Sequence, residues 1–440
     1  MKKLLWYALA VLISTTFAFS TVAAMVPKRT VLNNGLVLLT SEQRALPMVS
    51  IELLIDAGSR NDPPNQAGLA NLTSQLLTHG TKRRSATQIS ETLDFMGASL
   101  STGAGEDIAT VSMTLLKKDL VTGLELLAEV LTQSNFPQSE IDRQKQAVIA
   151  SIRAREEDPG ALAGTAFAAA LFPKSPYGRP VEGTAASVKN LQQKSLQDFF
   201  ARNYRPNRAI IAVVGDVAES EIAQALTKAM KGWSKGAPGV KPQPLSEIGK
   251  PQNVQINKDL TQANIVLGHN GVVRGNPDYY AVQVMNYILG GGGFSSRAMD
   301  SIRNERGLAY SVYSYFAAEK SHGSFQFVMQ TKNETAAEAI RIAKEEMRRM
   351  REQPVTDQEL SDAKDYLIGS FPLRFDTNRK VAGFLSQVEY YELGLDYPER
   401  YADLIRSVTR DDVRRAAQQY LRPDELVTVI VAKQKKIGEK

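Results

Sequence analysis

Apolar residues recur along the chain with two different periods, and these periods predict both strands and helices. Short apolar runs at 29–32 and 36–39 are typical of strands, and they flank Asn33-Asn34-Gly35, whose residues accept positive φ and predict a hairpin. Longer segments with apolar residues three and four positions apart predict helices. Strands are also predicted at 48–55, 108–116 and 209–214, and helices at 85–96, 120–132, 138–156, 161–171, 195–203 and 219–230.

One further predicted helix, at residues 67–80, carries a neutral polar face. Its inward face consists of leucines, namely Leu69, Leu72 and Leu76. At about 100° per residue, Asn71, Ser74 and Gln75 fall together on another face, and Gly80 is predicted to end the helix. The sequence therefore combines a core-facing side with a cluster of amide and hydroxyl groups.

The order of elements recurs in the second half of the chain. Residues 138–142, which open a long helix, are echoed by residues 356–362, and Tyr204-Arg205-Pro206 is echoed by Tyr420-Leu421-Arg422-Pro423, each ahead of an apolar strand. The predicted fold class is α+β, with two similar α/β-sandwich halves. Each half is an antiparallel-rich sheet packed with helices, and a linker joins the halves like a clamshell. The alternative is that the chain contains two unrelated α+β domains that merely share the same types of turn and helix-end residues.

The first residues have the composition of a secretory signal. Lys2 and Lys3 precede the apolar run 4–13, and a small-residue end follows at Val22-Ala23-Ala24. An uncleaved anchor is the alternative, but the apolar run is well short of the roughly 20 residues that a span needs. We predict a signal peptide at 1–24, an N-terminal domain at 25–235, a linker at 236–250 and a C-terminal domain at 251–440. The predicted location is the periplasm, with no membrane span after signal cleavage.

The amino-acid composition excludes several kinds of catalytic and binding site. The absence of cysteine excludes disulfides, thiolate nucleophiles and cysteine-bound metal. The histidines His79, His269 and His322 are isolated, whereas catalytic zinc usually draws on clustered ligands. The formal net charge of +6 falls to +4 without the two signal-peptide lysines, which is too mild to predict a nucleic-acid partner. The glycine-rich segment 289–293 lacks the lysine of a phosphate-binding loop and is predicted to be a flexible loop before a helix at 297–306.

A series of short motifs occurs in order after residue 24. They are Ala57-Gly58-Ser59-Arg60, Gly68-Leu69-Ala70, His79-Gly80-Thr81, Glu156-Glu157-Asp158-Pro159, Tyr177-Gly178, Leu289-Gly290-Gly291 with Ser295-Ser296-Arg297, and Gly307-Leu308-Ala309-Tyr310-Ser311. Together they resemble the pitrilysin/insulinase family of zinc metallopeptidases, in its short two-domain bacterial branch related to the mitochondrial processing peptidase. The resemblance covers essentially the whole chain after the signal.

The resemblance implies which positions carry the zinc site in active members. Those members hold two zinc-binding His and a general-base Glu in an inverted H-x-x-E-H, and a second Glu about 76 residues further on. Here the corresponding positions are Asn71, Ser74, Gln75 and Ser151. Amides and hydroxyls are weak zinc donors, and a serine without an activating partner cannot deprotonate water. We therefore expect a degenerate site that has no metal and no catalysis of its own.

The resemblance also assigns a substrate-binding role to Arg303 and Tyr310. In the family, an Arg and a Tyr at this spacing resemble a clamp for the substrate carbonyl and the developing oxyanion, to which guanidinium and phenol groups can donate. The alternatives are an ion pair of Arg303 with Asp300 or Glu305, and a half-buried strand position for Tyr310.

The residues of the zinc-binding half of the site are thus replaced, whereas Arg303 and Tyr310, the substrate-binding half, are present. We expect the non-catalytic, substrate-binding subunit of an exported heteromeric zinc metallopeptidase, a heterodimer in which Arg303 and Tyr310 serve a zinc-bearing homologous partner. Zinc is expected only in that partner. Peptide substrates would add a strand at the edge of a sheet. The alternative is a peptide-binding or scaffold protein of the periplasm without peptidase activity.

Overall fold

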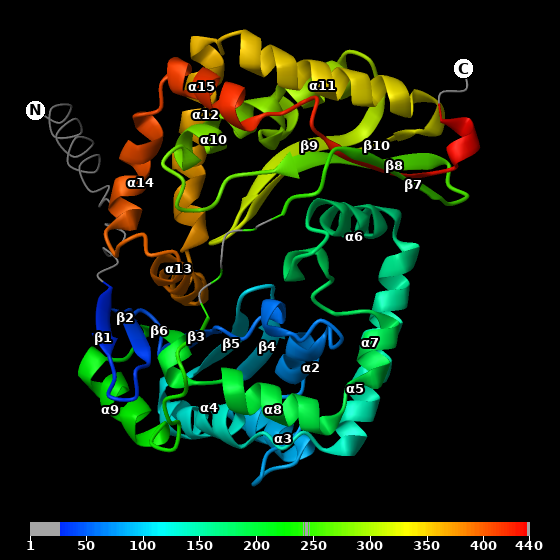
Figure 1. Ribbon diagram of the computed structural model, residues 1–440. Helices are drawn as coiled ribbons and strands as arrows, with labels where there is room; N and C mark the ends of the chain where they lie inside the picture. Colours follow the sequence, from blue (N-terminus) through cyan, green and yellow to red (C-terminus); the bar gives the residue numbers. More distant parts are fainter. Residues whose placement is uncertain (1–26, 241, 243–244, 246, 438–440) are drawn as a thin grey trace, which may run out of the picture.

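The computed structural model describes residues 27–240, 242, 245 and 247–437, so the predicted signal peptide lies outside the described residues. Two mixed sheets lie in separate halves, the N-terminal one in the lower part of Figure 1 and the C-terminal one in the upper part. The first sheet has the order β1 (Lys28–Val31), β2 (Val37–Glu42), β6 (Ala209–Gly215), β3 (Met48–Ile55), β5 (Ala109–Leu116) and β4 (Ser99–Ala104). The second has the order β7 (Gln252–Asn257), β11 (Val427–Ala432), β8 (Gln262–Asn270), β10 (Gly323–Lys332) and β9 (Ala309–Ala318).

The two sheets repeat one topology. Strands β2 to β6 have the same neighbours in the first sheet as β7 to β11 have in the second, and β1 is added at the edge. Each sheet has one parallel pair, β2 with β6 and β7 with β11, and its other pairs are antiparallel. The predicted pair of similar α+β halves is confirmed, and the alternative of two unrelated domains is wrong.

One face of each sheet is covered by helices of its own half. In the N-terminal half these include α2 (Leu69–Gln75), α3 (Ala86–Met96), α4 (Leu120–Gln133), α5 (Gln138–Glu157), α8 (Gln193–Asn203) and α9 (Glu219–Ala229). In the C-terminal half they include α10 (Tyr279–Asn286), α11 (Ala336–Glu352), α12 (Asp357–Ser370), α14 (Tyr397–Arg406) and α15 (Arg410–Tyr420). The apolar strand residues that alternate toward these helices form the two main cores.

The opposite face of each sheet is covered by a helix from the other half. Helix α6 (Pro159–Leu171) packs on β8 and β11, where Phe167 lies against Val429 and its neighbours. Helix α13 (Asn378–Tyr390) packs on β3 and β6, where Leu385 joins Val214. A Cβ atom added to Gly268 would lie 2.6 Å from the Phe167 ring, so a glycine is needed where α6 crosses β8. Because α6 and α13 occupy equivalent places in the repeat, the halves complete each other's cores reciprocally.

The segment predicted as a linker is attached to the protein at both ends. The Asn207 amide bonds both backbone groups of Gly236, at 2.8 Å to the nitrogen and 3.0 Å to the oxygen. At the other end, the Gly249 nitrogen donates to the Leu171 carbonyl in α6 at 2.8 Å. The connection between the halves is therefore anchored on both sides.

Some elements of the structure were missed or differ from their predicted form. Strand β4 and helix α7 (Ala185–Asn190) carry no strong apolar periodicity and were not predicted. Residues Tyr287–Gly291 continue α10 as the π-helix η5, so the first glycines of the glycine-rich segment are helical and not part of a loop. The helix predicted at 297–306 is the shorter π-helix η7 (Met299–Asn304). Within the described residues, no helix is both long and apolar enough to cross a membrane.

Candidate functional site

Helix α2 is shorter than predicted, and the Asp62 carboxylate binds the backbone nitrogens at its start. Asp62 accepts hydrogen bonds from the backbone nitrogens of Gly68 at 2.9 Å and Ala70 at 2.8 Å, so it satisfies donors at the helix start. Burial raises the pKa of Asp62 to about 7, although these backbone donors act in the opposite direction. Gly68 has φ of +94°, and a Cβ atom there would lie 2.5 Å from the Glu182 carbonyl oxygen. The motif Gly68-Leu69-Ala70 thus fixes where α2 starts.

The polar residues of α2 are joined to one another. The Ser74 hydroxyl donates to the Asn71 carbonyl at 2.8 Å, and Gln75 Nε2 donates to Asn71 Oδ1 at 3.3 Å. On α5, Gln144 Nε2 donates to Gln75 Oε1 at 2.8 Å. Ser74 is fully buried and Asn71 is 6% exposed, so only Gln75 of the three reaches the surface to any extent. The structure places the predicted residues together, in a chain of neutral amides.

Sequence reasoning missed Gln144, which is the α5 residue that contacts this chain. The predicted fourth position, Ser151, lies seven residues further along α5 and is exposed. Seven residues correspond to nearly two helical turns, so both side chains point to similar sides of α5 at different heights. Gln144 could have been identified from the sequence because it lies nearly two helical turns before Ser151 on the same side of the predicted helix. Its side chain is an amide, which can form a hydrogen bond with the amide of Gln75.

The α2 residues do not fit a zinc ion. Amide oxygens that already accept hydrogen bonds are poor ligands, and the buried Asn71 Nδ2, which finds no partner in the described part of the chain, is a donor and repels a cation. No group of three or more His, Cys, Asp or Glu side chains that could hold a metal occurs among the residues described. Hence no step of metal chemistry is assigned to this chain.

The histidines lie in separate environments. His79 follows α2, and burial lowers its pKa. His269 on β8 is buried and accepts a hydrogen bond from the Arg422 backbone nitrogen at 3.1 Å. His322 lies 3.1 Å from the Glu106 carboxylate. The three rings thus lie in different surroundings, and the Nδ1 atoms of His79 and His322 are buried without a hydrogen-bond partner among the described residues.

Arg303 and Tyr310 lie together with a third residue that the sequence did not indicate. The Arg303 guanidinium carbon is 4.9 Å from the ring centroid of Phe294 and 5.6 Å from that of Tyr310. Gly307, at φ +61°, turns the chain from η7 into β9. Tyr310 is the extra residue of a bulge, because Ala309 and Ser311 face consecutive residues of β10. The ion pairs with Asp300 or Glu305, which were the alternative interpretation of Arg303, are absent within the described residues, and its guanidinium faces aromatic rings.

This cluster is exposed at the edge of the C-terminal sheet. Phe294 is 71% exposed and Tyr310 is 76% exposed. Tyr313 and Tyr315, also on β9, stack with their ring centroids 6.1 Å apart. Strand β9 is the last strand of its sheet and β4 the last of the other, so each has one side without a strand partner in the described structure. The arrangement presents aromatic rings, a guanidinium and a strand edge without a further strand partner to a ligand or a second chain.

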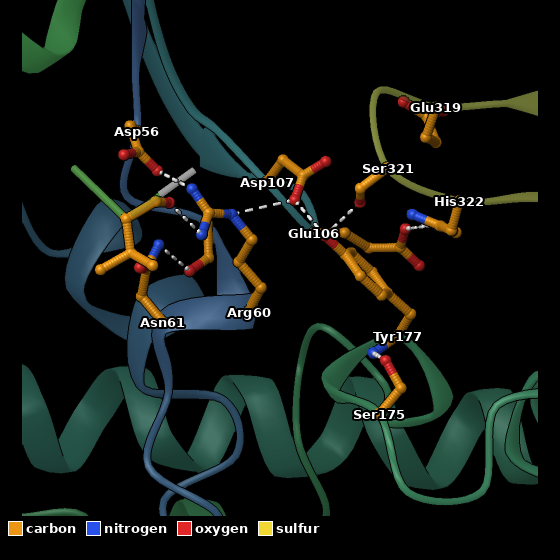
Figure 2. Close-up of polar contacts among 12 residues, drawn as sticks. Asp56, Arg60, Asn61, Glu106, Asp107, Ser175, Tyr177, Glu319, Ser321 and His322 are labelled. Atoms are coloured by element: carbon orange, nitrogen blue, oxygen red, sulfur yellow. Dashed lines mark hydrogen bonds and ion pairs between the residues drawn. The ribbon is translucent and has the colours of Figure 1, made fainter. Parts of the chain in front are cut away.

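A different group of motif residues joins the two halves (Figure 2). The Arg60 guanidinium pairs with Asp56 and, at 3.0 Å, with Asp107. The Tyr177 hydroxyl donates to Asp107 at 2.7 Å and accepts from Ser321 of the C-terminal half at 3.0 Å. The motifs at 57–60 and 177–178 therefore stabilise the junction between the halves.

The fold and the replaced α2 residues define an inactive homologue of a two-domain peptidase. Comparison of the sequence with protein families shows that residues 37–185 match Insulinase (Peptidase family M16) and residues 190–367 match the Peptidase M16 inactive domain. The chain belongs to peptidase family M16, as the motifs predicted.

Solved and curated relatives support this assignment over nearly the whole chain. The crystal structure of a peptidase M16 inactive domain from Pseudomonas fluorescens is 30% identical with a TM-score of 0.88, and the match covers 93% of this chain and 98% of that one. The non-peptidase homolog YmxG of Helicobacter pylori is 28% identical over 396 residues, which are 90% of this chain and 91% of that protein. An uncharacterized zinc protease of Streptomyces coelicolor is 28% identical over 405 residues, 90% of this chain and 87% of the other. Because relatives of equal identity carry both kinds of name, the residues of α2 decide that this member is inactive.

Proposed function

We propose that the chain is the non-catalytic, substrate-binding subunit of an exported zinc metallopeptidase that acts in the periplasm. Its partner is a homologous subunit that carries the zinc and the general base. In the closed pair, Arg303 and Tyr310 donate to the carbonyl of a bound peptide and to the oxyanion that forms at the partner's zinc.

The observation that carries this proposal is the contrast between the two half-sites. The α2 amides bond to each other and to Gln144, which leaves them little capacity for a ligand. Tyr310 is instead exposed and Arg303 lies half-buried beside it, and the guanidinium has no carboxylate partner among the described residues. Side chains that serve only the chain's own stability do not require this exposure, whereas contact with a second molecule does.

The edge strands supply a means of binding an extended peptide. A peptide strand added to β4 would lie beside α2, since these two elements pack together. Main-chain hydrogen bonds give such a peptide affinity without requiring one sequence. This agrees with a subunit that holds the substrate backbone while the partner supplies the chemistry.

A peptidase assay tests the proposal directly. The chain without residues 1–24, a zinc-bearing homologue from the same organism, and their mixture are each given a fluorogenic peptide. We expect activity that a chelator abolishes in the mixture and none with this chain alone. Arg303→Ala combined with Tyr310→Phe should lower the activity of the mixture about 10²-fold or more, because losing one oxyanion donor has an effect of that size.

The matched control replaces the same residue types elsewhere on the C-terminal half. Arg414 and Tyr366 are both exposed, so Arg414→Ala with Tyr366→Phe should leave the activity unchanged. Chelator-sensitive cleavage by this chain alone would overturn the non-catalytic role. Full activity of the mixture with the Arg303/Tyr310 double variant would overturn the clamp.

A scaffold without peptidase activity is the second candidate, favoured by the rigid junction of the two halves. Under that function, mixing with the homologue produces no gain in peptide cleavage even if the two chains co-purify.

A further inference from the structure

A cavity of about 410 Å³ in the C-terminal half has three cationic side chains in its lining and no acidic one. The cations are Arg274, Arg374 and Lys380, and four aromatic side chains share the lining with them. The cavity of about 450 Å³ at the junction of the halves differs, because carboxylates such as Asp56 and Asp107 line it beside its arginines. The excess of positive charge is therefore a property of the first cavity, which we call the arginine-tyrosine cavity.

Arg274 is held in place by neutral groups. Its guanidinium carbon lies 3.8 Å from the ring centroid of Tyr279, and its Nη2 donates to the Tyr397 hydroxyl at 3.0 Å. Tyr280 provides a further hydrogen bond. No carboxylate pairs with this guanidinium in the described part of the chain. Since a guanidinium has five donors, two phenols leave donors that an anionic ligand can use.

Arg374 brings a second unpaired charge to the same place. It ends the short helix η9 (Phe371–Arg374), is exposed, and forms no ion pair with a described carboxylate. Arg274, Arg374 and the Tyr279 phenol all line the same cavity. Lys380 differs, because Asp376 pairs with it at 2.8 Å. Two guanidiniums therefore remain for a ligand.

The phenols around the cavity do not neutralise these charges. Burial raises the pKa of Tyr397 and of Tyr391 above the ordinary range, so both stay protonated at neutral pH. The Glu319 carboxylate accepts the Tyr391 hydroxyl at 2.7 Å and is not among the residues that line the cavity. Neither guanidinium forms an ion pair with a described carboxylate, so both can attract carboxylate or phosphate oxygens of a ligand.

We propose that the arginine-tyrosine cavity binds a small organic anion. Its carboxylate or phosphate group pairs with Arg274 and Arg374, and its apolar part lies against Phe384 and Tyr391, which line the same cavity. The volume lies within the range of about 300 to 1,000 Å³ that small-molecule sites occupy. This site uses neither α2 nor Arg303 and Tyr310, so it stands independently of the proposed function.

Calorimetric titration of the chain without residues 1–24 tests the proposal with three probes. They are inorganic phosphate, N-acetylphenylalanine and its uncharged amide. We expect saturable binding of at least one anionic probe with a Kd of about 1 mM or tighter, and none of the amide. Binding of phosphate alone would identify a phosphate site, and binding of N-acetylphenylalanine alone would identify a carboxylate site.

Variants then locate the binding. Arg374→Gln changes an exposed side chain and should weaken the anion about 10-fold or more, the effect of losing one charge-assisted hydrogen bond. Arg414→Gln, also exposed and on the same half, should bind as the unaltered chain does. Arg274→Gln should abolish binding while circular dichroism shows an intact fold. The proposal is overturned if no anionic probe saturates, if the amide binds as well as the acid, or if Arg374→Gln binds like the unaltered chain.

Discussion

Acidification should destabilise the protein through His269, and the structure gives the size of the effect. His269 is 2% exposed on β8. Its Nδ1 lies 2.8 Å from the Asn270 carbonyl and its Nε2 accepts from the Arg422 nitrogen, so the ring is neutral with the proton on Nδ1. A second proton on Nε2 would face the Arg422 N–H and break that bond. Burial accordingly lowers the pKa of His269 to about 4.

The direction of the pH effect follows from this lowered pKa. In the unfolded chain a histidine titrates near about 6.5, so between that value and about 4 the unfolded state binds a proton that the folded state does not. The stabilisation is complete above about pH 6.5 and is lost as the pH falls. At about 1.4 kcal/mol per unit of pKa, the shift of His269 contributes about 3 kcal/mol to the free energy of unfolding above about pH 6.5. About 2 kcal/mol of this contribution is lost by about pH 5.

Urea unfolding followed by circular dichroism at about pH 7.5 and about pH 5 measures this loss. His269→Gln removes the titrating ring, so the variant should lose about 2 kcal/mol less than the unaltered chain over the same interval. Burial also lowers the pKa of His79, but this contribution is common to both proteins and cancels in the comparison. Equal losses in the two proteins would refute the assigned role of His269.

Two further changes test how the elements are held. Asp62→Ala leaves the buried nitrogens of Gly68 and Ala70 without their acceptor, so we expect a loss of about 2 to 5 kcal/mol in the urea unfolding free energy, and Asp62→Asn, which retains one acceptor oxygen, should lose less. Phe167→Ala should lower the unfolding free energy by about 3 to 5 kcal/mol, since this ring is 1% exposed between α6 and the C-terminal sheet, whereas Phe95→Ala, at a 91% exposed position, should leave it nearly unchanged.

Sequence patterns predicted the fold well where burial follows one period. Strand β3 has the predicted bounds, and α4 and α5 begin at the predicted residues, because each buries a regular apolar face. Strand β4 was missed since its sequence, Ser-Leu-Ser-Thr-Gly-Ala, is polar at the sheet edge. The glycines after Leu289 were predicted to be a loop, but a Cβ atom on Gly290 would lie 2.5 Å from Ser314 Oγ. Close packing on β9, which the sequence does not reveal, favours glycine within that helix.

The candidate site was predictable only where its residues share an element. Helical spacing placed Asn71 and Gln75 together, and the structure joins them by a hydrogen bond. The contact of Gln75 with Gln144 depends on how α5 crosses α2, which no local pattern specifies. Phe294 is likewise brought to Arg303 by the path of the chain between η5 and η7. Tertiary packing thus supplied the partners, while the sequence supplied the residue types.

The reciprocal packing of α6 and α13 limits how this chain can close around a peptide. Separating the halves would expose Phe167 on one side and Leu385 on the other, and it would also break the buried contact of Tyr177 with Ser321. Each buried side chain of this size contributes about 1.5 to 3 kcal/mol, so opening is strongly unfavourable. We therefore expect the two halves to move as one body and any closing motion to occur between this chain and a partner. The Phe167→Ala measurement bears on this directly, because a small loss of stability would mean that the halves separate easily.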